Sequence, residues 1–347
     1  MTTMKAIVKA RPEPGGLDLL EVPIPNPGPG EALLKNRAVA ICGTDLHIYN
    51  WDAWSQKRVR IPTILGHEFA ADVVKVGEGV TNIKVGDYVS GEGHLVCGFC
   101  DNCRTGKGHV CYNWKGLGYD IDGVFREYFV MPEMNIWKND ADTPSERAAI
   151  QDPLGNAIHT VFRADCVSKT VAVYGLGPVG LLAVATLRAI GAAQIFAFGR
   201  KNTYRLDLAR KLGAHHVVRV MDTDPVEYVK DRTEGMGVDV AVEIAGTSEA
   251  IQAAIRSVKM GGDVVVLGIP SEEVPVDFAS DVVFRSVSIH GVTGRRMWDS
   301  WLRMKGLLKS GRLDVGPVIT HRFPFDECHK GFELMKTGNC GKVVLEL

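Results

Sequence analysis

The segment Thr170-Val-Ala-Val-Tyr-Gly-Leu-Gly-Pro-Val-Gly180 decides the fold of this chain. An apolar strand is predicted from Val171 to Tyr174, and an apolar helix from Pro178 to Ile190. Between them, Gly175 permits a tight turn, Gly177 lets backbone amides approach a pyrophosphate, and Gly180 lets the helix pack closely on the strand. A glycine-rich turn without a ligand is the alternative. The strand-turn-helix setting favours a dinucleotide site.

Strands and helices alternate on the C-terminal side of this segment. The predicted strands are Gln194–Phe198, His216–Val220, Val238–Glu243, Asp263–Leu267 and Val287–His290, and the predicted helices are Tyr204–Leu212, Pro225–Thr233 and Ser248–Lys259. Such alternation predicts an α/β fold with a doubly wound parallel sheet.

The N-terminal part of the chain, residues 1 to about 155, has a different pattern. Its short apolar runs are separated by Pro/Gly turns and comprise Lys5–Ala10, Glu31–Ala40, Ala70–Val76, Asp87–Ser90 and Phe125–Val130. This pattern predicts a small β-barrel with long loops. After Gly294 we expect one helix, Met297–Ser310, and then extended pieces that end at Lys342–Leu347 and return to the first domain. The predicted domains are therefore 1–155 with 295–347, and 156–294.

The second predicted strand of the doubly wound domain ends in Gly199-Arg200-Lys201. An acidic residue about 20 positions after the fingerprint would bind the ribose hydroxyls of NAD, but no acid is present there. Gly199 carries no carboxylate to repel a 2′-phosphate, while Arg200, Lys201 and Arg205 can pair with one. The sequence favours NADP over NAD. A solvated helix start, with NAD bound through other contacts, is the alternative.

Four of the eight cysteines are crowded into Cys97-x2-Cys100-x2-Cys103-x7-Cys111. Four thiolates form a closed tetrahedral site, which is the structural kind of zinc site. Residues 91 to 119 have too few apolar side chains for a core of their own, so a metal would take its place. An iron-sulfur cluster is the alternative, disfavoured because no other redox feature is present. The isolated cysteines Cys166, Cys328 and Cys340 are predicted to be small buried side chains.

A second group of metal-ligating residues is scattered along the N-terminal part. It comprises Cys42, His67, Glu68 and Asp152. One thiolate, one imidazole and one or two carboxylates would leave a coordination position open, as at a catalytic zinc. Equally, Cys42 is consistent with an ordinary buried cysteine and His67 with a satisfied buried histidine.

Composition excludes several classes of function. The chain has 347 residues, 46% of them hydrophobic, and its 40 Lys+Arg against 41 Asp+Glu give a net charge of -1. This balance disfavours nucleic acid and membrane surfaces as partners. The N-terminus MTTMKAIVKARPEPGG lacks the apolar core of a secretory signal. The run Val179–Ile190 is too short to span a bilayer. We expect a cytoplasmic protein that acts on a small molecule.

Taken together, these motifs resemble the zinc-dependent medium-chain dehydrogenase/reductase family of the alcohol dehydrogenase type. The resemblance covers essentially the whole chain and includes Gly66-His67-Glu68, the four-cysteine segment, Gly77–Val80, Val85–Val89 and the glycine fingerprint, all in family order. It implies a GroES-like catalytic domain, a Rossmann domain, two zinc ions and NAD(P). It also implies a homotetramer, for which the sequence itself offers only the apolar segment Val282–His290.

Within that family, several stretches look like the branch that oxidises L-threonine. They are Cys42–Gln56, Ser90–His94, Asp152–Thr160 and Gly291–Trp298. The resemblance implies oxidation of the 3-hydroxyl of L-threonine to 2-amino-3-oxobutanoate, a step of threonine catabolism. The alternatives are a polyol, butanediol or sugar dehydrogenase, a catalytically silent sensor that binds zinc and a dinucleotide, and a zinc-free reductase-like protein.

The resemblance also implies roles for individual residues. Cys42, His67 and Glu68 would hold the catalytic zinc, with Asp152 as a fourth or exchangeable ligand. Thr44 and His47 would relay the hydroxyl proton to solvent, and His94 would border the substrate pocket. The implied cofactor contacts are Gly175, Gly177, Val179, Gly180, Gly199, Arg200, Arg205, Leu267 and Arg295. This chain departs from the family's pattern at Asp152, where many relatives have glutamate, and at Gly199-Arg200, where most threonine-oxidising relatives have an acid and use NAD.

Overall fold

The computed structural model describes residues 2–347, which form two compact units. One comprises Met1–Asp152 with Ile319–Leu347, and the other comprises Pro153–Val318. Residues 295–318 therefore lie in the second unit, whereas the predicted first domain included them. The reason is local packing, because the turn Gly316–Val318 contacts helices α6 (Pro178–Ile190) and α7 (Thr203–Lys211) of the second unit.

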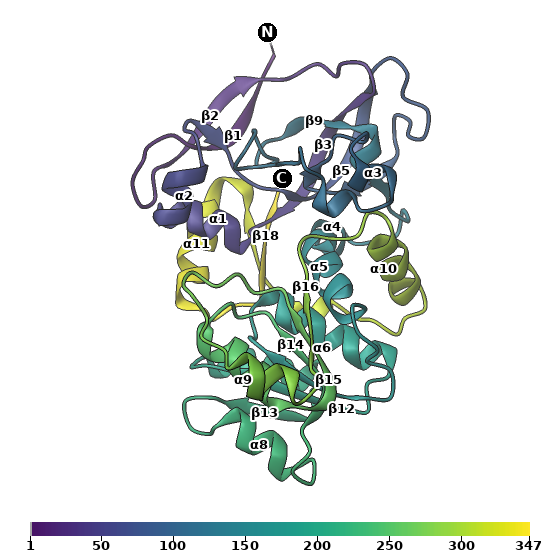
Figure 1. Ribbon diagram of the computed structural model, residues 1–347. Helices are drawn as coiled ribbons and strands as arrows, with labels where there is room; N and C mark the ends of the chain where they lie inside the picture. Colours follow the sequence, from purple (N-terminus) through teal and green to yellow (C-terminus); the bar gives the residue numbers. More distant parts are fainter. Residues whose placement is uncertain (1) are drawn as a thin grey trace. The chain divides into compact units, whose positions relative to one another are not determined.

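The second unit is built on a six-stranded parallel sheet (Figure 1). Its strands are β11 (Thr170–Tyr174), β12 (Gln194–Gly199), β13 (His216–Arg219), β14 (Val238–Glu243), β15 (Val258–Val266) and β16 (Ser288–Gly291). They are ordered β13-β12-β11-β14-β15-β16, and every neighbouring pair is parallel. This is the strand order of the dinucleotide-binding α/β fold, which confirms the predicted fold class.

Helices α6, α7, α8 (Pro225–Asp231), α9 (Ser248–Ser257) and α10 (Asp299–Lys309) belong to the same unit. Their ends follow the sequence signals: α6 begins with Pro178 in its first turn and ends before Gly191, which has left-handed backbone angles. One boundary differs from the prediction. The helix expected to reach Lys259 ends at Ser257, and β15 already begins at Val258, because it pairs with Val238 of β14 before the expected start.

The first unit contains three sheets. Its strands are β1 (Thr3–Lys9), β2 (Leu17–Pro23), β3 (Glu31–Ala40), β4 (Thr63–Ile64), β5 (Glu68–Val76), β6 (Tyr88–Gly91), β7 (His94–Leu95), β8 (Lys115–Gly116), β9 (Tyr128–Pro132), β10 (Ile136–Lys138), β17 (Ile319–Pro324) and β18 (Lys342–Glu346). The sheet orders are β2-β1-β4, β7-β8, and β10-β6-β5-β3-β18-β17 with β9 also paired to β3. The C-terminal strand therefore pairs with β3, as expected for a tail that returns to the first domain.

The described helices of the first unit were not predicted, because the sequence analysis indicated only strands, long loops and extended pieces there. They are α1 (Gly43–Asn50), α2 (Ala53–Arg58), α3 (Asp101–Arg104), α4 (Ser145–Ala149) and α11 (Cys328–Thr337), while α5 (Gln151–Val161) crosses the unit boundary. The prediction of extended structure was wrong for α11. Its buried residues Cys328, Gly331, Phe332 and Met335 follow helical spacing, which is the signal that was overlooked.

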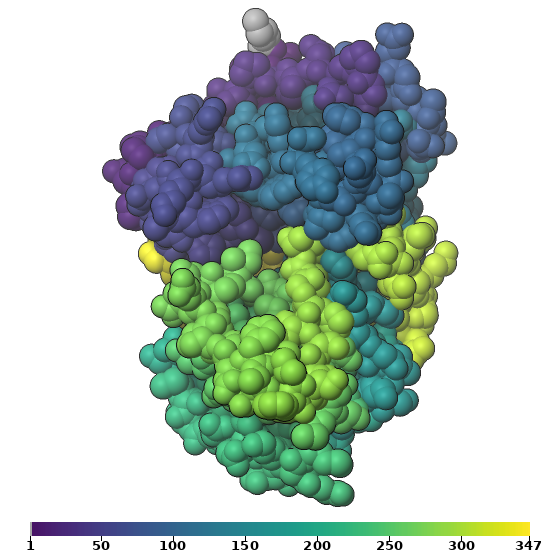
Figure 2. All heavy atoms as spheres, viewed as in Figure 1, coloured from purple at the N-terminus to yellow at the C-terminus, as the bar shows by residue number. Residues whose placement is uncertain are grey.

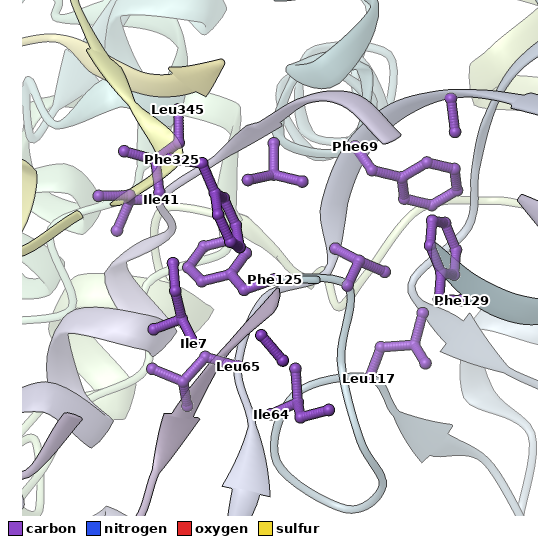
Figure 3. Packing of buried hydrophobic residues seen from close by; sticks show 14 of the residues in the cluster. Ile7, Ile41, Ile64, Leu65, Phe69, Leu117, Phe125, Phe129, Phe325 and Leu345 are labelled. Atoms are coloured by element: carbon purple, nitrogen blue, oxygen red, sulfur yellow. The ribbon is translucent and has the colours of Figure 1, made fainter. Parts of the chain in front are cut away.

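The core of the first unit joins its strands to the returning tail. Figure 3 shows Ile7 and Phe125 beside Ile41, Phe325 and Leu345, so residues from both ends of the chain share one cluster. Phe69 and Phe129 pack edge to face, with ring centroids 4.8 Å apart. Cys166, Cys328 and Cys340 are all buried, as predicted. Within residues 2–347, no helix is both long and apolar enough to cross a membrane.

Candidate functional site

Three neighbouring strands bring one group of polar residues to the same edge of the large sheet. β3 ends at Ala40, which pairs with Glu68 at the start of β5 and with Val344 in β18. Because β5 and β18 both run antiparallel to β3, both strands begin near the point where β3 ends. Cys42, Glu68 and Lys342 are thereby placed together, although the chain separates Glu68 from Lys342 by 274 positions.

Buried Asp45 and Gly66 hold the two loops that carry Cys42 and His67. The Asp45 carboxylate accepts the Cys42 N–H at 2.9 Å and the Gly66 N–H at 3.1 Å, so one side chain ties both loops together. Gly66 has φ +89°, and a Cβ there would lie 2.1 Å from the Phe125 ring. Only glycine fits this turn, which presents His67 directly after it. Burial raises the pKa of Asp45.

The side chains of Cys42, His67 and Glu68 converge as a metal site requires. Each offers one donor atom, and the three atoms lie within 4.8 Å of one another. His67 Nδ1 is buried and has no hydrogen-bond partner among the described residues. Burial works to lower the pKa of His67, but the charges of Cys42, Asp45 and Asp152 raise it to about 10. The surroundings are therefore negative enough to hold a cation, and the donor set fits Zn²⁺.

Asp152 lies near this group but outside the set of converging donor atoms. It is buried at the start of α5, and a Cβ on Gly93 would lie 3.2 Å from its Oδ2 and 3.1 Å from the Cβ of His67. Its charge acts on both His67 and Glu68. The structure thus places the predicted fourth ligand beside the site, at a position where it can act on its neighbours electrostatically.

Glu68 has a second partner that sequence analysis did not identify. Lys342 Nζ lies 2.7 Å from Glu68 Oε1 and 2.5 Å from Oε2, and it donates to the Ile41 carbonyl at 2.9 Å. The side chains are only 2% and 0% exposed. A charge buried this deeply is tolerated because it is paired and hydrogen-bonded.

Replacing Lys342 with Met is expected to destabilise the protein by about 3–5 kcal/mol, because it leaves the Glu68 carboxylate buried without its ion-pair partner. The measurement is the urea midpoint of the zinc-free protein, in which no zinc ion can take the place of Lys342 beside Glu68. Lys336→Met is the matched control, since Lys336 pairs with Glu333 on the surface and its loss should change the midpoint little. Equal midpoints for the two variants would contradict the interpretation of this ion pair.

Helix α1 begins immediately after Cys42 and carries the two residues of the expected proton relay. Thr44 and His47 are three positions apart and so share a helix face. Thr44 Oγ1 lies 3.8 Å from the Cys42 Sγ. The His47 side chain is 62% exposed and contacts Asp52. The predicted relay therefore runs from the metal-ligating group toward solvent.

His94 lies on β7 and belongs to a row of aromatic rings that leads toward His67. Its ring is 4.6 Å from that of Trp114, Trp114 is 6.2 Å from Tyr119, and Tyr119 is 6.2 Å from His67, edge to face. Trp54 lies 6.0 Å from Tyr119 and 6.2 Å from His47. These rings form an apolar wall beside the candidate metal site. Trp54 is not among the residues that the sequence analysis predicted for the site.

The four cysteine side chains of the four-cysteine segment lie close together. The Sγ atoms of Cys97, Cys100, Cys103 and Cys111 come together, with separations of 3.5 Å for Cys100–Cys103 and Cys97–Cys111 and 3.8 Å for Cys100–Cys111. These distances are far too long for disulfides. They match the edge of about 3.8 Å in a tetrahedron with Zn–S distances of about 2.3 Å. Only Gly108 and Cys111 are buried between residues 97 and 113, so the segment has no apolar core.

The second unit assembles the predicted dinucleotide contacts at one sheet edge. Gly199 is the last residue of β12, and Gly175, Leu267 and Arg295 come after β11, β15 and β16. The carboxyl ends of these strands meet at the same edge because the strands are parallel. A Cβ on Gly180 would lie 1.9 Å from the Gly175 carbonyl oxygen, so α6 packs on the turn as predicted. A Cβ on Gly177 would meet no atom within 4 Å, which leaves open space at the N-terminus of α6 for a pyrophosphate.

The positive residues that were predicted to contact the dinucleotide follow β12 in the chain. Arg200 and Lys201 are exposed, and Arg205 is half-buried in the first turn of α7. The Asn202 side chain accepts the Arg205 N–H at 3.1 Å and fixes the start of that helix. Val179 is half-buried in the first turn of α6. Arg295 is buried, and its Cγ lies 2.8 Å from where a Cβ on Gly155 would be.

Comparison with known proteins places the whole chain among described families. Residues 28–141 match the family model described as "Alcohol dehydrogenase GroES-like domain", and residues 178–310 match the one described as "Zinc-binding dehydrogenase". The L-threonine 3-dehydrogenase of Caldanaerobacter subterraneus is 49% identical over 99% of this chain and 98% of that protein. The L-threonine 3-dehydrogenase of Bacillus licheniformis is 50% identical, also over 99% and 98%.

Solved structures show the same architecture. A putative zinc-binding dehydrogenase from Sinorhizobium meliloti, bound to NADP, superposes with a TM-score of 0.91 at 30% identity and full coverage of both chains. An alcohol dehydrogenase from Escherichia coli, in complex with NADH, gives a TM-score of 0.91 at 27% identity, again with full coverage. The fold is thus found with either dinucleotide.

Proposed function

Because the chain belongs to the zinc-dependent dehydrogenases of the alcohol dehydrogenase type, and within them to the L-threonine 3-dehydrogenases, we propose that it oxidises the 3-hydroxyl of L-threonine. The hydride passes from C3 to the nicotinamide of NAD(P), and the product is 2-amino-3-oxobutanoate. The observation that carries the reaction type is the convergence of Cys42, His67 and Glu68 next to the helix that bears Thr44 and His47. The choice of L-threonine as the substrate rests on the full-length similarity to the L-threonine 3-dehydrogenases.

The metal-ligating residues have distinct tasks in this proposal. Cys42, His67 and Glu68 hold zinc, while Asp152 serves as an exchangeable ligand or acts through its charge on His67. A zinc ion in this place would lower the pKa of the substrate hydroxyl, so that it loses its proton near neutral pH. The four-cysteine segment holds a second zinc in place of a core. We therefore propose two zinc ions per chain.

The proton leaves along helix α1. Thr44 Oγ1 accepts the proton, and His47 passes it to water, which its exposed side chain reaches. His94 and the adjacent aromatic wall exclude water from the carbon that gives up the hydride. The fingerprint turn at Gly175–Gly180 binds the pyrophosphate, and Arg200, Lys201 and Arg205 favour NADP over NAD.

The test is nicotinamide reduction by the zinc-loaded, full-length protein. L-threonine, 2,3-butanediol and a sugar polyol are compared, each with NAD and with NADP. Turnover of threonine well above that of the other alcohols supports the proposal. Preferential turnover of the butanediol or polyol overturns the substrate, and zinc and dinucleotide binding without any turnover points to a silent sensor.

We further propose a cytoplasmic homotetramer, in which the sheet of the second unit continues into a second copy. β16 is an edge strand of the six-stranded sheet. Exposed apolar side chains gather near it: Phe278, Val283 and Phe284 are 64%, 64% and 79% exposed, and Ile289 is 41% exposed. Figure 2 shows atoms of this stretch, in light green, on the surface. An isologous pairing of two such edges would bury the patch and remove the open edge.

Replacing Phe284 with Asp is expected to convert the tetramer into a smaller species, because a carboxylate would be buried in the apolar contact. Sedimentation velocity at micromolar concentration measures the mass. Phe99→Asp is the matched control, since Phe99 is likewise an exposed phenylalanine, at 64%, but lies in the four-cysteine segment. An unchanged mass for Phe284→Asp would contradict an interface at this edge.

A further inference from the structure

Asp52 lies directly against His47, and its contacts are built into the turn between α1 and α2. Asp52 Oδ2 is 2.5 Å from His47 Nδ1. The Asp52 N–H donates to the His47 carbonyl at 3.4 Å, and the Ser55 hydroxyl donates to the same carbonyl at 3.1 Å. Trp51, the residue between the two helices, has left-handed backbone angles, which turn the chain back over the last turn of α1. Contacts from this turn therefore reach both the ring and the backbone carbonyl of His47.

The two oxygens of the Asp52 carboxylate have separate partners. Oδ1 caps helix α2 by accepting the Ser55 N–H at 3.0 Å and the Ser55 hydroxyl at 2.9 Å. Oδ2 is left to His47. Partial burial would raise the pKa of Asp52, but the hydrogen bonds from Ser55 and His47 lower it, so the carboxylate is ionised. The helix cap therefore uses only one of the two carboxylate oxygens of Asp52.

We propose that Asp52 is the positioning residue of the proton relay and fixes His47 with its hydrogen on Nδ1. An ionised carboxylate can only accept a hydrogen bond, so the neutral imidazole must carry its hydrogen on Nδ1 and leave Nε2 as the acceptor. When Nε2 takes the proton that Thr44 delivers, the carboxylate stabilises the resulting imidazolium until that proton leaves to water. This inference rests on the relay in the proposed function and adds the group that orients it.

The replacement of Asp52 by Asn tests this directly. Asparagine is as good a helix cap as aspartate, so its Oδ1 can keep the Ser55 contacts. Its amide nitrogen would face Nδ1 as a donor and force the hydrogen onto Nε2, which can then no longer accept a proton. We expect kcat for threonine to fall about 10- to 100-fold, with KM little changed. This is the range expected when one hydrogen bond to a charged group is lost.

A double-mutant cycle separates this role from a structural one. In a His47→Ala background, D52N should change kcat by less than about twofold, because the residue it acts through is absent. Asp52→Ser, which keeps a capping hydroxyl but cannot reach Nδ1, should cost less than D52N. Equal losses from D52N in both backgrounds, or no loss in either, would overturn the proposal.

A spectroscopic measurement makes the inference independent of the substrate. The 15N chemical shifts of the His47 ring, assigned by comparison with His47→Ala, report which nitrogen carries the hydrogen. We expect hydrogen on Nδ1 in the native protein and on Nε2 in D52N. If the protein oxidises a different alcohol, the double-mutant cycle is run with that alcohol. If it oxidises no alcohol, the proposed function fails, but the 15N measurement of the His47 tautomer still decides the role of Asp52. The Nε2 form in the native protein would refute it.

Discussion

Replacing Cys42 with Ala is expected to lower kcat/KM for L-threonine by about 10³-fold or more. Zinc chemistry of this kind contributes several kcal/mol of transition-state stabilisation, and each 1.4 kcal/mol is about tenfold in rate. Cys42 supplies the one thiolate of the converging donors, so its loss leaves His67 and Glu68 with too few ligands. Steady-state kinetics and the zinc content of the purified protein, expected to fall from two ions per chain to one, are the measurements.

Two other cysteines provide controls for this variant. Cys103→Ala also removes one zinc, but from the four-cysteine segment, so it should make residues 97–113 sensitive to proteolysis before it reduces turnover. Cys166→Ala removes a buried thiol outside both groups and should leave the zinc content at two. If Cys42→Ala keeps both zinc ions and full activity, the assignment of the catalytic metal site is wrong.

The ratio of kcat/KM with NADP to that with NAD is expected to fall by about 10³-fold when Gly199→Asp is combined with Arg200→Ala. In the proposed NADP complex the arginine would donate a charge-assisted hydrogen bond to the 2′-phosphate. The new carboxylate would repel that group and accept hydrogen bonds from the NAD ribose. A Cβ on Gly199 would lie 2.9 Å from Leu206 Cδ2 and 3.1 Å from Leu176 Cδ1. Both are ends of flexible side chains, which can move aside.

Arg210→Ala is the control for the change of dinucleotide. Arg210 is exposed on α7 and pairs with Asp207, so its removal should leave the NADP to NAD ratio unchanged. Measuring both dinucleotides at several concentrations separates binding from turnover. A native protein that already prefers NAD would contradict the interpretation of Gly199, Arg200 and Arg205 while leaving the reaction intact.

The sequence predicted the features that depend on local pattern. The fingerprint from Gly175 to Gly180 and the alternation that follows it identified the parallel sheet, because each strand or helix is encoded by neighbouring residues. The cysteine spacing likewise predicted a cluster that the structure brings within 4.8 Å. Strand β2 was not predicted, because most of its side chains are exposed and its order comes from pairing with β1.

Contacts between residues far apart in the chain could not be predicted from the local sequence pattern. Lys342 looks like an ordinary surface residue until β18 pairs with β3 and places it against Glu68. Asp45 and Asp52 each lie within a motif that was noticed, yet their roles depend on which atoms they reach after the chain turns. Residues 295–318 were assigned to the first domain because nothing in their own sequence reveals the contacts of the turn at 316–318 with α6 and α7.

The return of the C-terminal strand sets the order in which this protein can mature during translation. The chain leaves the first unit after Asp152 and re-enters it at Ile319, so the ribosome makes the whole second unit before β18 exists. Lys342, the partner of Glu68, is the first residue of β18. A nascent chain can therefore complete its dinucleotide-binding unit early, whereas the edge that gathers Cys42, His67 and Glu68 closes only after β18 has been made. A premature stop before residue 342 would yield a protein that carries every proposed zinc-ligating residue and still lacks the strand that completes the site.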